Sequence, residues 1–201
     1  MDKRLIGITG GIGSGKSRVC RFWANHFSLP VIDLDAICKS LLDVGEPGWQ
    51  AIQDCFGDRF FTEDAEIDRP LLRQTLFADN ELRHQVDNLL HPLARKIMGQ
   101  RVRQLKSQVV LVEIPLLFEA GWSGDVDAVV VVFAGTEVRC RRIVERDKVN
   151  SAQAMQAIRS QMSLADKVMS ADHVIDNSGD WLDTCLQIIH AGQQLSGKST
   201  E

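Results

Sequence analysis

GGIGSGKS, residues Gly10–Ser17, matches the phosphate-loop pattern GxxxxGK(S/T). It follows a short apolar run, Leu5–Ile8, and opens a helical pattern over Lys16–Phe27, which is the strand–loop–helix setting that the pattern needs. Glycines let successive backbone N–H groups turn towards one anion, and the following helix adds the positive end of its dipole. We therefore predict a nucleotide phosphate site in which Lys16 reaches the β- and γ-phosphates and the Ser17 hydroxyl ligates Mg²⁺.

A second match to the same pattern runs from Gly192 to Ser199. No apolar strand precedes it, and only two residues follow it, so no helix is expected there to offer N–H groups to a phosphate. We interpret this second match as accidental, because the context carries the inference rather than the pattern alone.

The composition is that of an ordinary globular chain, with 201 residues, 44% apolar and 25% charged. The net charge of −4 gives no general attraction for nucleic acid or an anionic membrane, so any bound anion needs a local site. The five cysteines are widely spaced without a CxxC pair, which predicts reduced thiols rather than a zinc site or a disulfide framework. The longest apolar run, Ala128–Ala134, is too short to span a bilayer, and no targeting segment is visible. We expect a cytoplasmic protein without nucleic-acid or membrane partners; its oligomeric state stays open.

Apolar stretches rich in Val and Ile, without polar alternation, predict the buried strands of a parallel sheet. They are Leu5–Ile8, Val31–Asp33, Val109–Ile114, Ala128–Phe133 and His173–Asp176. Helical patterns lie between them, so we predict an α/β fold with a parallel five-stranded sheet of the P-loop NTPase type, covered by helices. After the fourth strand we expect a helix that breaks at Asp147–Ser151, and a second helix from about Ala152 to Met169.

The connection between the second and third strands is about 75 residues long, far beyond an ordinary crossover. Its patterns predict helices over Ala36–Asp43, Trp49–Phe56, Pro70–Phe77 and Glu81–Lys106. Pro92 lies inside the last of these, and we expect it to kink or split that helix near His91. We predict that residues 36–107 form a helical insertion for the acceptor substrate, while residues 1–35 and 108–201 form the nucleotide-binding core.

Arginines gather on the helix after the fourth strand, which we expect Thr136 to cap. Arg139, Arg142 and Arg146 share one helix face by their spacing of i, i+3 and i+7. They form either a lid, about residues 136–165, that closes over the nucleotide and neutralises the transferring phosphoryl group, or a solvated helix face. The like-charged pair of Arg142 and Arg146 is unfavourable without an anion between them, which favours the lid. In an open lid we expect the side chains of Arg142 and Arg146 to be exposed.

Acidic residues follow two of the predicted strands, where ligands of open α/β sheets bind. Asp33 ends the second strand, in a position for a carboxylate that orients an acceptor hydroxyl and takes its proton. The alternative is that either Asp33 or Asp35 caps the next helix; we assign Asp33 to function, and Asp35 to capping or to contacts with Mg²⁺-bound water. Glu113, near the end of the third strand, is either a group behind the Mg²⁺ ligands or a solvated acid.

Taken in order, these residues resemble the dephospho-CoA kinase family from Leu5 to about Gly179. The resemblance rests on the phosphate loop, Val31–Asp35, Ile67–Arg69, Leu90–Pro92, Pro115–Glu119, Arg142–Arg146, Gln161–Met162 and Ala171–Asn177. The loop alone is shared by many nucleotide-binding proteins, whereas the ordered set is specific. The sequence departs from the family pattern at Arg18, at Glu113, where Asp is usual, at Ala65, where Gly is frequent, and at Cys38-Lys39.

The resemblance implies transfer of the ATP γ-phosphate to the ribose 3′-hydroxyl of dephospho-CoA, with Mg²⁺ as cofactor. It implies catalytic roles for Asp33, Lys16, Arg142 and Arg146. The implied ATP contacts are Gly11, Ile12, Gly13, Ser14, Gly15, Lys16, Ser17, Arg18 and Asn177, of which Asn177 looks like part of an adenine-side loop. The implied acceptor contacts are Asp33, Arg69, His91, Pro115, Leu116, Leu117 and Glu119. From chemistry alone, His91 is either a substrate contact or a residue that ends a helix before proline, and the second role is favoured.

Two other functions remain open from the residues. Another P-loop kinase for a small molecule or a nucleoside monophosphate would use the same chemistry on a different acceptor. A P-loop regulator that binds nucleotide without catalysis is of another class, and regulators of the GTPase type need an NKxD-like guanine contact, which the sequence lacks.

Overall fold

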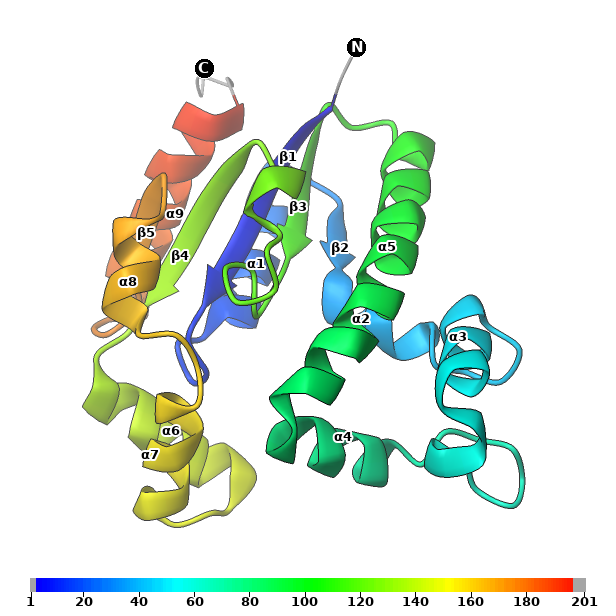
Figure 1. The fold of residues 1–201 in the computed structure, drawn as a ribbon. Coiled ribbons are helices and arrows are strands. Elements are labelled where there is room, and N and C mark those ends of the chain that lie inside the picture. Colours follow the sequence, from blue (N-terminus) through cyan, green and yellow to red (C-terminus); the bar gives the residue numbers. More distant parts are fainter. Residues whose placement is uncertain (1–2, 197–201) are drawn as a thin grey trace. The chain divides into compact units, whose positions relative to one another are not determined.

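The structure, a computed structural model, describes residues 3–196 of the chain (Figure 1). It divides into two compact units. One holds the chain up to Ile32 and again from Leu105 onward, and the other is Asp33–Gln104.

The first unit is built on a parallel sheet with the strand order β2-β3-β1-β4-β5. β1 pairs in parallel with β3 and with β4, and β4 pairs in parallel with β5. The predicted five-stranded α/β fold of the P-loop type is therefore confirmed. The strands are β1 (Arg4–Gly10), β2 (Val31–Asp33), β3 (Val109–Glu113), β4 (Ala128–Phe133) and β5 (His173–Asp176).

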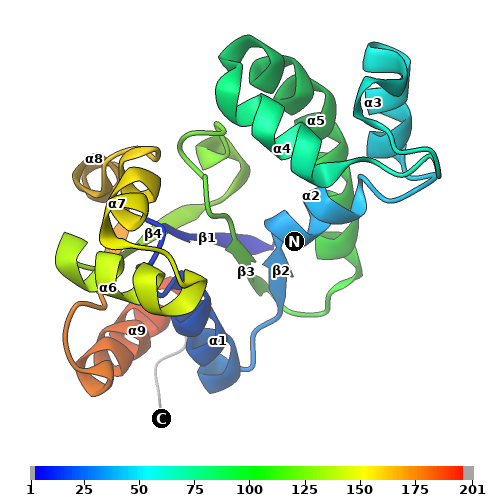
Figure 2. The same ribbon diagram turned by 90° about the horizontal axis from the view of Figure 1, so that it is seen from below.

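Helices cover the sheet, which explains why its central strands are apolar without alternation. α1 (Lys16–Phe27) and α9 (Trp181–Ser196) lie on one face, and α8 (Leu164–Met169) lies towards the other (Figures 1 and 2). Trp23 of α1 and Ile188 of α9 are fully buried in one core cluster with β1 and β4.

The second match to the phosphate-loop pattern begins inside α9. Gly192 is buried where α9 packs on α1, and a side chain at this position would collide with the ring of Phe27. Residues 192–196 belong to α9 and are helical, so they form no phosphate loop. Gly192 instead allows α9 to pack closely on α1. Lys198 and Ser199 lie outside the described residues.

The chain between β4 and β5 forms α6 (Thr136–Asp147), α7 (Ser151–Arg159) and α8. Two expectations were wrong here. Gly135, not Thr136, is the N-cap of α6, and no side chain caps that helix. The expected second helix is two helices, because Ser163 begins α8 as a new N-cap and accepts a hydrogen bond from the Asp166 N–H.

The second unit contains α2 (Leu34–Ser40), α3 (Pro47–Phe56), α4 (Arg69–Ala78) and α5 (Asn80–Gln104). These elements enclose a separate apolar core, which includes Ile52, Phe60 and Val86. Pro92 does not split the last helix, since α5 is continuous through it. Ala65 adopts φ 59° in the tight turn between Thr62 and Glu66, a conformation that glycine adopts at lower cost.

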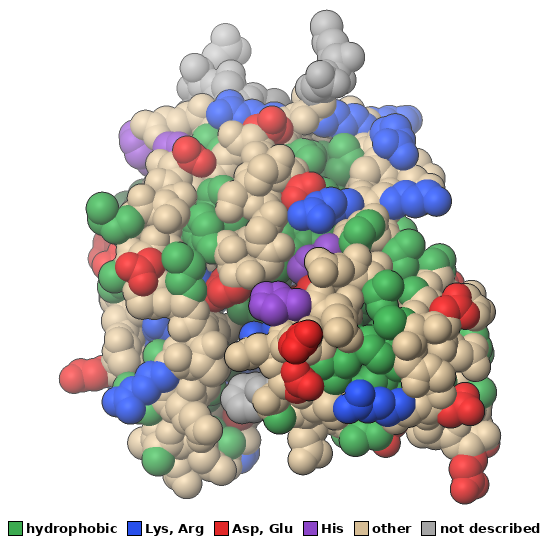
Figure 3. Space-filling model, viewed as in Figure 1, with side chains coloured by type: hydrophobic (Ala, Val, Ile, Leu, Met, Phe, Trp, Pro, Cys, Tyr) green, Lys and Arg blue, Asp and Glu red, His purple; other side chains and the backbone are tan. Residues whose placement is uncertain are grey.

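No helix in the described part of the chain is long and apolar enough to cross a membrane. On the face shown in Figure 3, Lys and Arg side chains are interspersed with Asp and Glu rather than gathered into one basic field.

Candidate active site

The phosphate loop joins β1 to α1 and needs glycine at particular points. Gly13 and Gly15 have φ angles of 77° and 87°, in the left-handed region that favours glycine. A Cβ atom at Gly13 would lie 2.8 Å from the Arg139 carbonyl oxygen, and one at Gly15 would collide with the Asn177 side-chain amide. The loop is therefore packed closely on its outer side by α6 and by the segment after β5.

Glu113, at the end of β3, holds the two chemically active side chains of the loop. Its Oε1 lies 2.8 Å from Lys16 Nζ and accepts a hydrogen bond of 2.6 Å from Ser17 Oγ. The side chains of Lys16 and Glu113 are each only 13% exposed, so the ion pair is well shielded. Of the two interpretations of Glu113, this contact favours a group directly behind Ser17 over a solvated acid.

Arg139 and Arg142 of α6 bind the backbone of the phosphate loop. Arg139 Nε donates to the Ile12 carbonyl at 2.8 Å, and Arg142 Nη1 donates to the carbonyls of Gly13 and Ser14 at 3.4 and 3.3 Å. Burial lowers the pKa of the Arg139 guanidinium, and burial together with the charges of Arg141 and Arg18 lowers the pKa of Arg142. The expectation of an exposed side chain was wrong for Arg142, which is half-buried, and Arg139 is only 4% exposed.

Arg146 behaves differently from these two arginines. It is paired with Asp147, with Nε 2.7 Å from Oδ1, and the Arg146 side chain is 61% exposed. The hydrogen bond to Asp147 raises the pKa of Arg146. Because Arg142 and Arg146 have separate partners, the argument that this pair needs an anion between its members does not hold for the observed arrangement.

Asn177, in the segment after β5, holds the backbone of the phosphate loop. Its Nδ2 donates to the Ser14 carbonyl at 2.7 Å, its Oδ1 accepts from Thr184 Oγ1 at 3.3 Å, and its backbone carbonyl accepts from Arg142 Nη2 at 2.9 Å. The residue is 3% exposed. Arg18, on the first turn of α1, stacks its guanidinium 3.7 Å from the centre of the Trp181 ring.

The segment after β3 carries four of the expected acceptor contacts. The Pro115 carbonyl accepts a hydrogen bond from Thr9 Oγ1 at 3.2 Å, and Leu116 is exposed. Leu117 is fully buried against Gly7, which leaves only its backbone for a substrate contact. Glu119 Oε1 lies 2.7 Å from Nζ of the fully buried Lys167 and accepts from the Met162 N–H at 3.2 Å, so its carboxylate is occupied within the protein.

Asp33 is the N-cap of α2 in the second unit. Its Oδ1 accepts a hydrogen bond of 3.0 Å from the Ala36 N–H, so the assignment of the cap to Asp35 was wrong. Both carboxylates, with that of Asp87, lie near the Cys38 thiol. Burial, then the charges of Asp35, Asp87 and Asp33, raise the pKa of this thiol to about 11.

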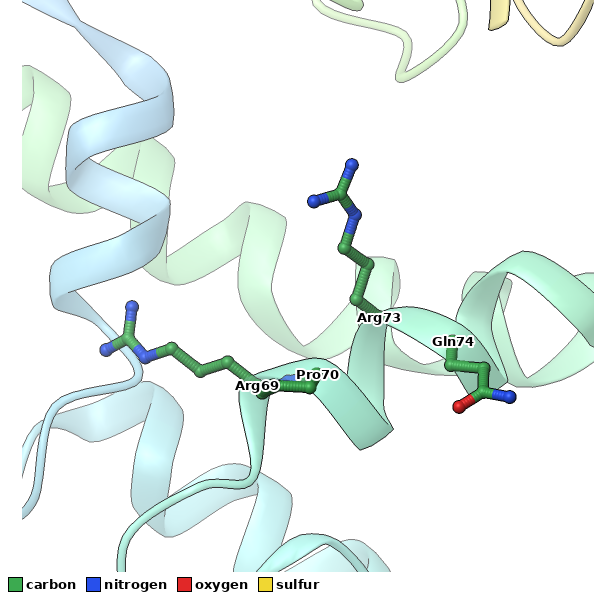
Figure 4. A pocket seen from close by; sticks show the side chains of 4 residues that line it. All are labelled: Arg69, Pro70, Arg73 and Gln74. Carbon is green, nitrogen blue, oxygen red and sulfur yellow. The ribbon is translucent and has the colours of Figure 1, made fainter. Parts of the chain in front are cut away.

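Arg69 and His91 also have partners inside the second unit. Arg69 Nη2 donates to the Lys39 carbonyl at 3.1 Å and pairs with Asp43 Oδ1 at 2.7 Å, whereas His91 Nε2 lies 3.7 Å from Asp87 Oδ1. A cavity of about 590 Å³ lies beside α4 (Figure 4). It is lined by Arg69, Pro70, Arg73 and Gln74.

Metal-binding groups are sparse, since no cluster of three or more His, Cys, Asp or Glu residues within 3–196 is arranged to hold a metal ion. A nucleotide-bound Mg²⁺ needs fewer protein ligands, because phosphates and water supply most of its oxygens. The Ser17 hydroxyl beside the Glu113 carboxylate offers oxygen groups of the kind that Mg²⁺ prefers, so these residues fit the ion.

Comparison with known proteins identifies the family. Residues 4–183 match the family model of dephospho-CoA kinase. The chain belongs to the dephospho-CoA kinase family. A dephospho-CoA kinase of Bacillus thuringiensis subsp. konkukian is 38% identical over 187 residues, which cover 92% of this chain and 93% of that protein.

Solved structures agree with dephospho-CoA kinase membership. A Thermus thermophilus protein matches with a TM-score of 0.86 and 30% identity, with 100% of both chains covered. The dephospho-CoA kinase of Campylobacter jejuni matches with a TM-score of 0.68 and 28% identity, with 97% of this chain and 98% of that chain covered.

Some residues that shape this dephospho-CoA kinase site escaped the sequence reasoning. Arg139 was placed on the right helix face, but nothing in its spacing says that it is buried against the loop. Gln161 belongs to one of the segments that resemble the family, but the sequence offers no reason to assign it a contact. In the structure its Oε1 accepts a hydrogen bond from the Ile12 N–H at 2.8 Å. Lys167 has no sequence signal at all, because lysine is rarely buried.

Proposed function

We propose that this protein transfers the γ-phosphate of ATP to the ribose 3′-hydroxyl of dephospho-CoA, giving CoA and ADP. The observation that carries the proposal is the family match over residues 4–183, which spans the complete phosphate-binding arrangement of Lys16, Ser17 and Glu113. The same arrangement suits a nucleoside triphosphate with Mg²⁺, because it sets a positive charge and a metal-binding hydroxyl at one carboxylate.

The loop residues would bind the triphosphate of ATP. Backbone N–H groups of the loop other than those of Ile12 and Ser14, which bond within the protein, cradle the phosphates. Lys16 places its charge on the β- and γ-phosphates. Ser17 would hold Mg²⁺, with Glu113 orienting the Ser17 hydroxyl. The bound ion neutralises charge on the phosphate oxygens. In this arrangement Asn177 and Arg18 support the loop and the first turn of α1, instead of serving only as contacts to the adenine of ATP.

Asp33 is our candidate for the group that takes the proton of the 3′-hydroxyl. It is the last residue of β2, and the carboxyl ends of parallel strands lie at the same edge of a sheet, where ligands bind. Oδ1 already accepts the Ala36 N–H, but a carboxylate has lone pairs for further hydrogen bonds.

The acceptor contacts are proposed from the second unit and the segment after β3. Arg69 and Arg73 line the cavity beside α4 and are suited to the phosphates of dephospho-CoA. A guanidinium group can donate two parallel hydrogen bonds to the oxygens of one phosphate. His91 would donate a hydrogen bond to the acceptor. Pro115, Leu116 and Leu117 would add apolar and backbone contacts, and Arg142 and Arg146 would neutralise charge as the phosphoryl group transfers.

We also propose a cytoplasmic location. Cys38, Cys55, Cys140 and Cys185 are free thiols in the structure, which suits a reducing compartment.

A substrate panel tests the function. The purified protein is given ATP and Mg²⁺ with dephospho-CoA, AMP or shikimate, and both ADP release and the mass of the product are measured. We expect ADP release only with dephospho-CoA and a product that is heavier by one phosphoryl group at the 3′ position. Turnover of AMP or shikimate alone would favour another small-molecule kinase, and ATP binding without acceptor-dependent ADP release would favour a regulator.

A further inference from the structure

Residues 160–163, the connection between α7 and α8, are tied to two other parts of the first unit. Gln161 Oε1 accepts a hydrogen bond of 2.8 Å from the Ile12 N–H of the phosphate loop. The next residue, Met162, donates its own N–H to Glu119 Oε1 at 3.2 Å. This short connection therefore joins the phosphate loop to the segment after β3.

Two side chains from the lid region hold Ile12 by its backbone. Gln161 accepts the N–H, and the Arg139 guanidinium donates to the carbonyl at 2.8 Å. Arg139 is 4% exposed, so its bond is sheltered from water. Gln161 and Arg139 also line one cavity of about 480 Å³, which places both groups at the same hollow.

Because a peptide group is planar, the hydrogen bonds to the N–H and the carbonyl of Ile12 also fix the direction of the Gly11 carbonyl and the Gly13 N–H. The Ile12 N–H lies in one plane with the Gly11 carbonyl, which accepts the Ser14 N–H at 3.0 Å in the turn of the loop. The Ile12 carbonyl lies in one plane with the Gly13 N–H and points opposite to it. Gln161 and Arg139 thus set the direction of both peptide groups at a point where Gly13, with φ 77°, leaves the chain easily rotated.

A buried ion pair sets the position of Gln161 in turn. Lys167 on α8 is fully buried, and Glu119 Oε1 lies 2.7 Å from its Nζ. A buried ammonium holds its counter-ion tightly, because losing the partner leaves a charge without compensation in the protein interior. Glu119 is thereby fixed, and it fixes the Met162 N–H next to Gln161.

We propose that Gln161 is a positioning residue that holds the phosphate loop in its nucleotide-binding shape, and that Glu119 and Lys167 act through it. Glu119 then serves the nucleotide side of the reaction instead of touching the acceptor. The inference rests on the proposed binding of ATP by this loop.

The first test compares Gln161→Met with Gln156→Met. Methionine keeps the length of glutamine but has no strong acceptor, and Gln156 lies exposed on α7 as a matched control. Calorimetry with a non-hydrolysable ATP analogue and Mg²⁺ measures affinity, and the ¹H–¹⁵N spectrum reports the Ile12 amide. Gln161→Met is expected to weaken the analogue about two- to tenfold, to raise KM for ATP but not for dephospho-CoA, and to shift the Ile12 amide proton. Gln156→Met should do none of these.

The second test separates positioning from general damage. Glu119→Gln should weaken the analogue and shift the Ile12 amide, because it leaves Lys167 without its counter-ion. Glu119→Gln with Lys167→Met removes that buried charge and keeps an acceptor for Met162, so it should restore affinity and the amide signal.

The outcomes distinguish the two levels of the claim. A wild-type protein that does not bind the analogue overturns the proposed function itself. Wild-type binding with an unchanged affinity and amide signal in Gln161→Met overturns only the positioning role. Should Gln161→Met not fold, the Glu119 and Lys167 variants decide, and failure of the double variant to recover affinity contradicts the proposed route through Glu119.

Discussion

Asp33 combines a structural contact with a proposed chemical one. Its Oδ1 caps α2 through the Ala36 N–H, and the reaction asks the same carboxylate to orient a hydroxyl and accept its proton. Capping requires only an oxygen acceptor, whereas proton transfer requires a base. Asparagine supplies the first property and lacks the second, which makes the two roles separable in one variant.

Asp33→Asn should lower kcat by about 10²–10⁴-fold and leave the melting temperature almost unchanged. The lower end suits a loose phosphoryl transition state, in which the proton leaves late. Turnover is measured by ADP release, and ATP affinity, measured by calorimetry, should stay similar or tighten as a negative charge is lost.

Asp33→Ala serves as the structural control, because it should also lose about 1 kcal/mol of stability with the cap. Asp35→Asn should keep most activity. If Asp35→Asn is inactive and Asp33→Asn is near normal, the base is Asp35.

At the scale of elements, α6 is more a support of the phosphate loop than a free lid helix. Arg142 donates to the carbonyls of Gly13, Ser14 and Asn177, so it joins the loop to the segment after β5. Arg146, one turn further on, donates through Nε and Nη2 to the carboxylate of its neighbour Asp147. Two arginines on one helix face thus have different surroundings.

Arg142→Ala and Arg146→Ala should therefore differ in stability. Arg142→Ala removes the guanidinium that joins the Gly13 and Asn177 carbonyls, and we expect it to lower the melting temperature by about 3–10 °C and to reduce kcat. Arg146→Ala should change the melting temperature little, because an exposed ion pair contributes little, yet it should reduce kcat if Arg146 reaches the phosphates. Thermal melting and ADP release on both variants check this, and equal melting temperatures would contradict the support role of Arg142.

The packing of α9 on α1 gives a prediction with an internal control. Gly192→Ala puts a methyl group into the Phe27 ring and should destabilise the protein by about 1–3 kcal/mol. Gly99, inside α5, has its nearest such contact at 3.5 Å, so Gly99→Ala should stabilise by about 0.5–1 kcal/mol through helix propensity. Urea unfolding measures both, and an unaffected Gly192→Ala would show that α9 packs more loosely than described.

Sequence reasoning succeeded where a residue's role follows from its immediate neighbours. The five strands and the phosphate loop are of this kind, because apolar runs and glycine spacing act locally. It failed where the role depends on a distant partner. The spacing of Arg139 cannot reveal the Ile12 carbonyl, and Lys167 finds Glu119 only through tertiary packing. The cap of α2 was misassigned by two residues, which is the usual uncertainty of helix ends.

At the scale of the whole molecule, nucleotide binding should appear as thermal stabilisation. A ligand at 100 times its Kd adds about 2.7 kcal/mol, or roughly 5–10 °C in a chain of this size. Melting is followed with and without Mg²⁺ and a non-hydrolysable ATP analogue. Lys16→Ala should abolish most of this shift and most activity, since it takes away the charge on the phosphates.

Lys198→Ala is the matched control, because Lys198 belongs to the second match of the phosphate-loop pattern. It should keep both the thermal shift and turnover. A loss of the shift in Lys198→Ala with a normal Lys16→Ala would mean that the two matches had been assigned the wrong way round.

The strand order has a consequence for how the protein folds while it is being synthesised on the ribosome. β3 lies between β2 and β1 in the sheet, yet it is synthesised only after the whole of Asp33–Gln104. β1 and β2 therefore leave the ribosome without the strand that joins them, while the inserted helices have their own apolar core. Since local contacts form before distant ones, we expect the insertion to fold first during translation. Protease treatment of nascent chains stalled before β3 emerges should cut within β1 and spare α3–α5; protection of β1 at that stage would rule this order out.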